Sequence, residues 1–143
     1  MLEFGEKIPG KEYVDRPGAY AVIEKDGLYA VVKNPKSTFL IGGGIEEDET
    51  PEEALHREVL EEIGWSIRID KKIGVALQHI YVPEAEVYIS KEGHFYKATL
   101  LEQVNETSED THELLWLSKE DALKKILHES HRWALAGHSQ DSL

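Results

Sequence analysis

The chain has 143 residues, 28 acidic and 16 basic side chains, a formal net charge of −12 and no cysteine. Its length suits one core, so we predict a single domain over residues 1–143. The acidic balance argues against general nucleic-acid or membrane-surface binding, and no apolar run reaches membrane-spanning length. With no cysteine for disulfides and no visible signal peptide, we predict a cytoplasmic protein, either a monomer or a homodimer.

The first part of the chain is typical of β-structure. Residues 1–16 indicate an edge strand or an arm. A hairpin is expected from Gly18 to Val32, because Asp26 and Gly27 separate two apolar runs. A loop is predicted over residues 34–37, and a short strand over residues 38–41 leads into a glycine-rich segment.

A helix is predicted over residues 51–63. Thr50 is a good N-cap, Pro51 suits the first helical position, and Glu53 completes a capping box with Thr50. Gly64 favours the left-handed conformation that closes a helix. Apolar residues recur with helical spacing and predict one buried stripe. They are Ala54, Leu55, Val59, Leu60 and Ile63.

Further strands and helices are expected after this helix. The pattern indicates strands over residues 66–70, 73–82, 94–103 and 114–117, with a break at residues 83–86. Ser118 caps a predicted helix with Asp121 at its third position. A last helix is expected over residues 129–135, followed by a flexible tail over residues 137–143. Strands on both sides of the first helix favour a mixed sheet between helices.

The segment from residue 42 to residue 65 concentrates negative charge. It holds nine acidic residues against one strong base, Arg57. Two carboxylates about 4 Å apart repel by about 4 kcal/mol at an effective dielectric near 20. Glu58, Glu61 and Glu62 stand at i, i+3 and i+4, so they share a helix face. Three such carboxylates suit Mg²⁺ or Mn²⁺. The alternative is a solvated acidic face, and the spacing alone leaves both open.

The same segment resembles the Nudix box, in which spacing and residue types are specified together. The glycine is Gly43, the first acid is Glu49, and residues 57–64 read REVLEEIG. Trp65 ends the box where the family usually has an aliphatic residue, and Ile41 stands where many relatives have proline. The resemblance covers residues 43–65 closely and the flanking strands more loosely.

This resemblance implies an α/β/α sandwich with a mixed central sheet, in which the box forms a loop–helix–loop. It also implies a hydrolase dependent on Mg²⁺ or Mn²⁺ that cleaves the pyrophosphate linkage of a nucleoside diphosphate joined to another group. A nucleoside triphosphate or a dinucleoside polyphosphate is the substrate we expect, and no particular compound is specified. The alternative is a module of the same fold that senses a nucleotide without cleaving it.

The motif assigns roles to individual residues. Glu58, Glu61 and Glu62 are the expected metal ligands, Glu62 first, together with the backbone of Gly43. Arg57 and Glu49 are expected to orient the helix and the loop. The general base varies in position within the family. Our candidate is Glu113, with Glu92 and Glu109 as alternatives, and each of the three also fits a solvated surface acid.

Candidate substrate contacts lie outside the box. Arg16 and Lys36 are predicted to hold phosphates, with Lys33 as a further candidate, although surface charge balance explains them equally simply. Tyr81 and Phe95 are predicted to contact a base, as is Trp116, although aromatic residues in strands are more often core. Tyr81 also stands about where relatives that cleave dinucleoside polyphosphates carry a tyrosine. His128 and His131 are predicted to be structural rather than zinc ligands.

Overall fold

A computed structural model describes residues 1–104 and 112–137 of the chain. The predictions for Glu109 and for the tail beyond residue 137 lie outside the described residues. None of the helices in the described ranges is long and apolar enough to cross a membrane.

The described residues form one mixed sheet. Its strands are β1 (Leu2–Phe4), β2 (Tyr13–Lys25), β3 (Leu28–Lys33), β4 (Thr38–Gly44), β5 (Trp65–Val82), β6 (Val87–Gln103) and β7 (Glu113–Leu117). The strand order is β1-β5-β6-β2-β4-β3-β7. β1 pairs with β5 and β2 pairs with β6 in parallel, while the other pairs are antiparallel. The predicted mixed sheet is therefore confirmed.

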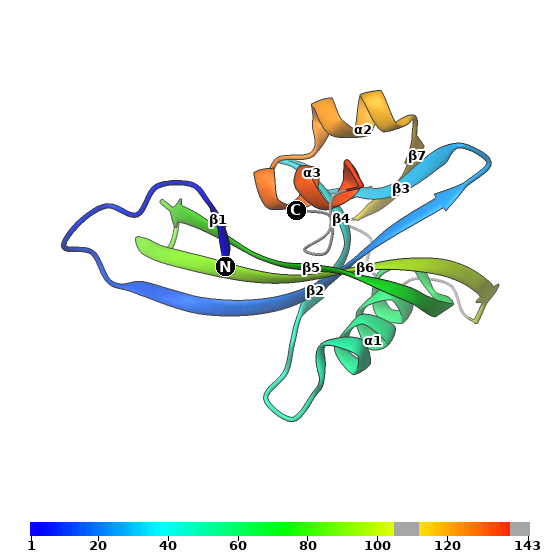
Figure 1. Cartoon of the computed structure of the whole chain (residues 1–143), viewed down its shortest axis with the longest axis horizontal. Coiled ribbons are helices and arrows are strands. Elements are labelled where there is room, and N and C mark those ends of the chain that lie inside the picture. The colour runs from blue at the N-terminus through cyan, green and yellow to red at the C-terminus, as the bar shows by residue number, and fades with distance from the viewer. Residues whose placement is uncertain (105–111, 138–143) are drawn as a thin grey trace.

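Helices cover both faces of the sheet (Figure 1). α1 (Pro51–Ile63) lies on one face, and α2 (Lys119–Lys125) and α3 (Glu129–Leu135) lie on the other. Side chains alternate along β2 between two cores, because successive residues of a strand point to opposite faces. Ala19 and Ala21 face the α1 core, whereas Tyr20 and Val22 face the α3 core. This arrangement confirms the α/β/α sandwich.

Most of the predicted local signals are present. Asp26 and Gly27 form the hairpin turn with positive φ angles of 53° and 80°, and the Ser118 side chain caps α2 by accepting from the Asp121 amide. Three strands are markedly longer than predicted, and one of them is β6, which begins at Val87 and not at residue 94. β5 is continuous through Lys71, because irregularities on either side of that residue let it stay paired with β6. β2 begins at Tyr13, which pairs with Tyr88 of β6.

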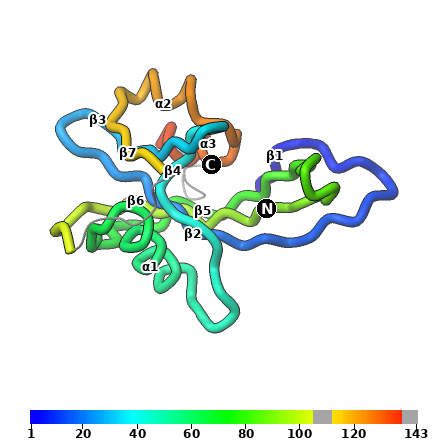
Figure 2. Tube along the Cα trace, turned by 180° about the vertical axis from the view of Figure 1, so that it is seen from behind, coloured from blue at the N-terminus to red at the C-terminus, as the bar shows by residue number. Residues whose placement is uncertain are grey.

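The box lies where three strands meet. Ala19 of β2 pairs with Gly43 of β4 on one side and with His94 of β6 on the other. α1 packs below this junction, and the loop from β4 to α1 projects away from it (Figure 2). The same view shows that β1 and the turn between β5 and β6 lie toward another end of the molecule. That end of the molecule therefore lies away from the box along the strands of the sheet.

Candidate active site

The two ends of α1 are set by the predicted residues. The Thr50 side chain accepts from the Glu53 amide at 3.1 Å, and the Glu53 carboxylate accepts from the Thr50 amide at 2.9 Å. Gly64 adopts the left-handed conformation with φ 76°, and its amide donates to the Leu60 carbonyl oxygen at 2.9 Å. The helix therefore begins and ends as predicted, which fixes the directions in which its carboxylates point.

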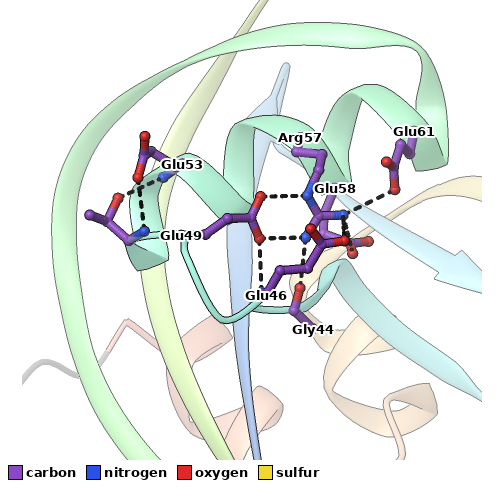
Figure 3. Close-up of polar contacts among 8 residues, drawn as sticks. Gly44, Glu46, Glu49, Glu53, Arg57, Glu58 and Glu61 are labelled. Carbon is purple, nitrogen blue, oxygen red and sulfur yellow. Dashed lines mark hydrogen bonds and ion pairs between the residues drawn. The ribbon is translucent and has the colours of Figure 1, made fainter.

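Arg57 lies at the centre of the box (Figure 3). Its Nε and Nη2 atoms donate to the two carboxylate oxygens of Glu49 at 2.6 and 2.7 Å. Nη2 also donates to the Gly44 carbonyl oxygen at 2.9 Å. Nη1 donates to Glu58 at 2.9 Å and to Glu61 at 3.2 Å. One guanidinium thus joins the loop to two acidic residues, Glu58 and Glu61, that follow Arg57 on the helix.

The contact between Arg57 and Glu49 keeps both side chains charged. Hydrogen bonds from Arg57 and from the Glu46 amide lower the pKa of Glu49 to about 2. The bond to Glu49 in turn raises the pKa of Arg57. Because neither group changes its charge near neutral pH, the loop remains tied to α1 under the conditions in which an enzyme works.

Gly43 makes room for the Glu58 carboxylate. A Cβ atom at position 43 would overlap Oε2 of Glu58, so any other residue would push that carboxylate away from the strand. The Glu58 side chain is 17% exposed and the Glu61 side chain is 52% exposed. The sequence alone gives no reason for this difference, which arises because Glu58 faces β4 and Glu61 faces outward.

Glu62 is the buried carboxylate of the box, with 6% of the residue exposed. Its Oε1 accepts from the Gly42 amide at 3.1 Å, and its Oε2 lies 3.0 Å from Nδ1 of His112. Sequence reasoning missed His112, because no motif marks it. The sheet order brings it there: β7 pairs with β3, β3 pairs with β4, and β4 ends beside Glu62.

A pocket of about 170 Å³ lies beside Glu62. Gly42 and Gly43 line it at the box, and Phe39 and Lys91 also line it. Tyr20 contributes its side chain from β2. Burial, together with the Glu58 and Glu62 carboxylates, raises the pKa of Tyr20 to about 12. The hydroxyl of Tyr20, which is protonated at neutral pH even with its ordinary pKa of about 10, is thus a hydrogen-bond donor near the carboxylates.

The donor chemistry of the box fits a hard divalent cation. Glu58 and Glu61 both contact the same positively charged nitrogen of Arg57 (Figure 3), and carboxylate oxygens are the ligands that Mg²⁺ and Mn²⁺ prefer. As these side chains stand, no three His, Asp or Glu residues among the described residues form a group that could hold a metal ion. Hydrogen bonds hold the three carboxylates in place: Arg57 donates to Glu58 and Glu61, and the Gly42 amide donates to Glu62. Gly43 provides the space beside Glu58.

A family model described as the NUDIX domain matches residues 15–136. The chain belongs to the NUDIX family. It is therefore a Nudix hydrolase, an enzyme of the family that hydrolyses nucleoside diphosphate-linked compounds at the pyrophosphate. The match extends from within β2 to the end of α3, so it includes all three helices and every strand except β1, whereas the box covers only part of this range. No curated protein gives a significant match to the sequence.

Solved structures of other proteins share the fold. A NUDIX hydrolase from Nitrosomonas europaea is 20% identical, with a TM-score of 0.70 over 91% of this chain and 96% of that one. A MutT NUDIX hydrolase from Burkholderia pseudomallei is 26% identical, with a TM-score of 0.67 over 86% and 97%. An ADP-ribose pyrophosphatase from Streptococcus suis is 17% identical, with a TM-score of 0.62 over 85% and 87%.

The predicted general base does not reach the pocket. Glu113 is exposed at the start of β7, where it stands opposite Lys33 in the pairing of β7 with β3. Its neighbour in the sequence, His112, lines the pocket instead. Glu92, one alternative, contacts His94 at 2.8 Å. The position of the base in this Nudix enzyme thus stays a prediction.

Two predicted phosphate ligands lie outside the pocket lining. Arg16 is exposed on β2, and its guanidinium donates to the Asp15 carbonyl oxygen at 3.3 Å. Lys36 forms an exposed ion pair with Glu84 at 3.1 Å, which joins the loop before β4 to the turn after β5. In this structure Lys36 thus balances a surface charge, that of Glu84.

Tyr81 is not brought to the box. It is 46% exposed, and its ring centroid lies 4.6 Å from that of Tyr88. Tyr88 precedes His94, the residue aligned with Ala19 and Gly43, by six positions on β6. At about 3.3 Å per residue, Tyr81 and Tyr88 lie about 20 Å from the box along the strand.

The prediction that Phe95 contacts a base is wrong. Phe95 is 1% exposed and belongs to the core between the sheet and α3, where its ring packs against Tyr20 at 5.7 Å and His131 at 5.4 Å. It faces inward because strand alternation places it on the side covered by α3. Trp116 packs against the α1 core, outside the pocket lining. His131 has the predicted structural role, since its Nδ1 accepts from the Leu40 amide at 3.2 Å.

Proposed function

We propose that this Nudix enzyme uses Mg²⁺ or Mn²⁺ to hydrolyse the pyrophosphate linkage of a nucleoside triphosphate or a dinucleoside polyphosphate. The observation that carries the proposal is the buried position of Glu62 at the wall of a pocket. Its two oxygens contact the Gly42 amide and His112. A buried carboxylate that faces a cavity is costly unless a cation or strong donors compensate it.

The residues of the box divide the work between binding and positioning. Glu58, Glu61 and Glu62, with the Gly43 backbone, would hold the ion, which when bound supplies charge neutralisation at the pyrophosphate and a lower pKa for the attacking water. Arg57 holds the loop in place through Glu49. Orientation of this kind is what a hydrolysis of a polyanion requires of the protein.

The Tyr20 hydroxyl supports the same function. Tyr20 lines the pocket together with Glu62, and its hydroxyl is protonated at neutral pH, as that of any tyrosine with the ordinary pKa of about 10 is; the site raises this pKa further, to about 12. A protonated phenol donates a hydrogen bond to a phosphate oxygen, whereas a phenolate would repel it. For the general base we keep Glu113 as the candidate, although it lies outside the pocket lining. We add His112 as a second candidate, because it lines the pocket.

The alternative is a nucleotide sensor of the same fold that binds without cleaving. All three carboxylates of the box are present in this chain, and Arg57 contacts two of them. A module that only senses nucleotides has no need to keep a metal-binding set of this kind. The complete set therefore favours the hydrolase.

Turnover measurements on box variants test the proposal. Nucleoside triphosphates, dinucleoside polyphosphates, nucleotide sugars and capped RNA ends would be screened with Mg²⁺, with Mn²⁺ and with a chelator. The wild type is compared with Glu62→Gln and with Glu47→Gln, an exposed residue of the same segment that the motif does not specify. We expect phosphate release that needs the metal and falls at least about 100-fold in Glu62→Gln only.

Two results would count against this function. Equal turnover by Glu62→Gln and Glu47→Gln would show that Glu62 is not a required metal ligand. Tight binding of a nucleotide by the wild type, with no product under any metal condition, would favour the sensor.

A further inference from the structure

Lys91 places a positive charge in the pocket, on the face of the sheet that α3 covers. Its Nζ atom lies 3.0 Å from Nε2 of His128 and 5.7 Å from the centroid of the Phe39 ring. His128 is 5% exposed, and its ring packs 5.3 Å from both Phe39 and His131. The ammonium group of Lys91 thus lies against two rings at the wall of the pocket.

No carboxylate of the described residues forms an ion pair with Lys91. Lys36 and Lys124, which are both exposed, each pair with a glutamate at 3.1 Å. Lys91 is half-buried and has no carboxylate partner among the described residues, in a chain whose net charge is −12. A charge removed from water without a counter-ion is unfavourable, so an anion that enters the pocket would gain from it.

The neighbour of Lys91 cannot act as the counter-ion. Burial, followed by the charges of Lys91 and Arg132, lowers the pKa of His128 to about 4. His128 is therefore neutral at pH 7 and accepts one hydrogen bond from the ammonium through Nε2. An ammonium has three N–H donors, so two remain for the oxygen atoms of a ligand. Burial also lowers the pKa of Lys91 itself.

The lining of the pocket consequently carries both signs of charge. Glu62 and the box glycines belong to it, where the pyrophosphate is expected, and Lys91 contributes to the same lining from β6. Arg16 is the partner of Lys91 in the parallel pairing of β2 and β6, so both side chains are on the same face of the sheet. A substrate that fills this pocket therefore meets the Lys91 cation, while Arg16 lies on the neighbouring strand outside the lining.

We propose that Lys91 binds a second anionic group of the substrate, a phosphate or a carboxylate, on the part of the molecule beyond the scissile pyrophosphate. This inference rests on the proposed function, because it takes the pyrophosphate to lie at the box. It narrows the substrate class to nucleoside diphosphate derivatives with an additional oxyanion. Lys91 is a specificity-determining residue under this proposal and takes no part in bond cleavage.

Matched pairs of substrates test the role of Lys91. NADPH and NADH differ by one phosphate, and UDP-glucuronic acid and UDP-glucose differ by one carboxylate, so the two pairs distinguish the sources of the oxyanion. We expect the wild type to prefer the anionic member of at least one pair by about tenfold in kcat/KM, mainly through KM, as a charge-assisted hydrogen bond provides. Lys91→Met should remove that preference, and Lys91→Arg should keep part of it.

Lys97→Met is the matched control. Lys97 lies on the same strand and the same face as Lys91, but it is exposed and outside this pocket. It loses one positive charge from the chain without touching the site, so its preference should equal that of the wild type. The proposal is overturned if the wild type prefers neither anionic member, or if Lys91→Met loses the same factor on both members of a pair.

Calorimetric titration in a chelating buffer separates this proposal from the proposed function. With NADPH and NADH, or with the UDP-sugar pair, binding is measured without turnover. If the wild type cleaves no compound but still binds an anionic member about tenfold more tightly, and Lys91→Met does not, the Lys91 site stands and the hydrolase fails. Equal binding of both members in both pairs removes the Lys91 site, whatever the activity.

Discussion

Arg57 and Glu49 form a two-point ion pair across the box, with N–O distances of 2.6 and 2.7 Å. Both oxygens of the carboxylate are used, which fixes the plane of one group relative to the other. The Glu49 side chain is 17% exposed and that of Arg57 is 25% exposed, so water has limited access to the pair. This contact holds the loop against α1 and thereby sets the position of the Gly44 carbonyl group.

Arg57→Lys should lower kcat/KM by about 10- to 100-fold while the fold is retained, because an ammonium cannot bridge both Glu49 oxygens and the Gly44 carbonyl. Steady-state kinetics over a range of Mg²⁺ concentrations measures the loss, and circular dichroism checks the fold. Arg68→Lys, at an exposed pair with Asp70 on β5, is the matched control. Equal kinetics for the two variants would contradict the positioning role of Arg57.

Gly43→Ala should lower activity by about tenfold or more, because the new methyl group overlaps the Glu58 carboxylate. Gly44→Ala meets no atom within 4 Å and leaves its carbonyl in place, so it should stay within about threefold of the wild type. The comparison requires kcat/KM for both variants and a urea titration to verify folding. Similar losses at the two positions would show that backbone freedom, not space for Glu58, is what the loop needs.

The buried histidines predict a loss of stability in mild acid. The pKa of His128 falls from 6.5 to about 4 in the folded protein, and burial also lowers that of His131. Between these pH values the unfolded chain binds more protons, so the free energy of unfolding decreases as pH falls. The contribution is fully present above about pH 6.5 and is lost as pH falls toward about 4, by about 3 kcal/mol for His128.

Urea unfolding at pH 7.5, 6 and 4.5 measures this effect. His128→Gln keeps an acceptor for Lys91 but does not titrate, so its stability should depend less on pH than that of the wild type. His56→Gln changes an exposed histidine on α1 and should leave the pH dependence as it is. An unchanged slope in His128→Gln would mean that other groups cause the acid sensitivity.

Phe95→Ala should lower the free energy of unfolding by about 3–5 kcal/mol, since it removes a ring that is 1% exposed and packed under α3. Tyr81→Ala removes a ring that is 46% exposed and should cost about 1 kcal/mol or less. Denaturant titrations of both variants provide the comparison. If Phe95→Ala raised KM and left stability unchanged, the substrate role first expected for Phe95 would return.

The sequence by itself determined the elements whose signals are local. Thr50, Pro51 and Gly64 fix α1 because capping and left-handed closure depend on a few neighbouring atoms, and Asp26 with Gly27 fixes a hairpin for the same reason. The spacing of the box carboxylates also followed from the sequence, because a helix of known start and end has a known phase.

Only the tertiary structure decided which of those carboxylates is buried and what faces it. Glu62 is covered because β4 runs beside α1. His112, just before β7, and Lys91, on β6, reach its pocket from parts of the chain that are distant in sequence. The same long-range pairing placed Phe95 in the core. Strand alternation shows that successive side chains point to opposite faces of the sheet. Which face each helix covers depends on packing across the whole sheet.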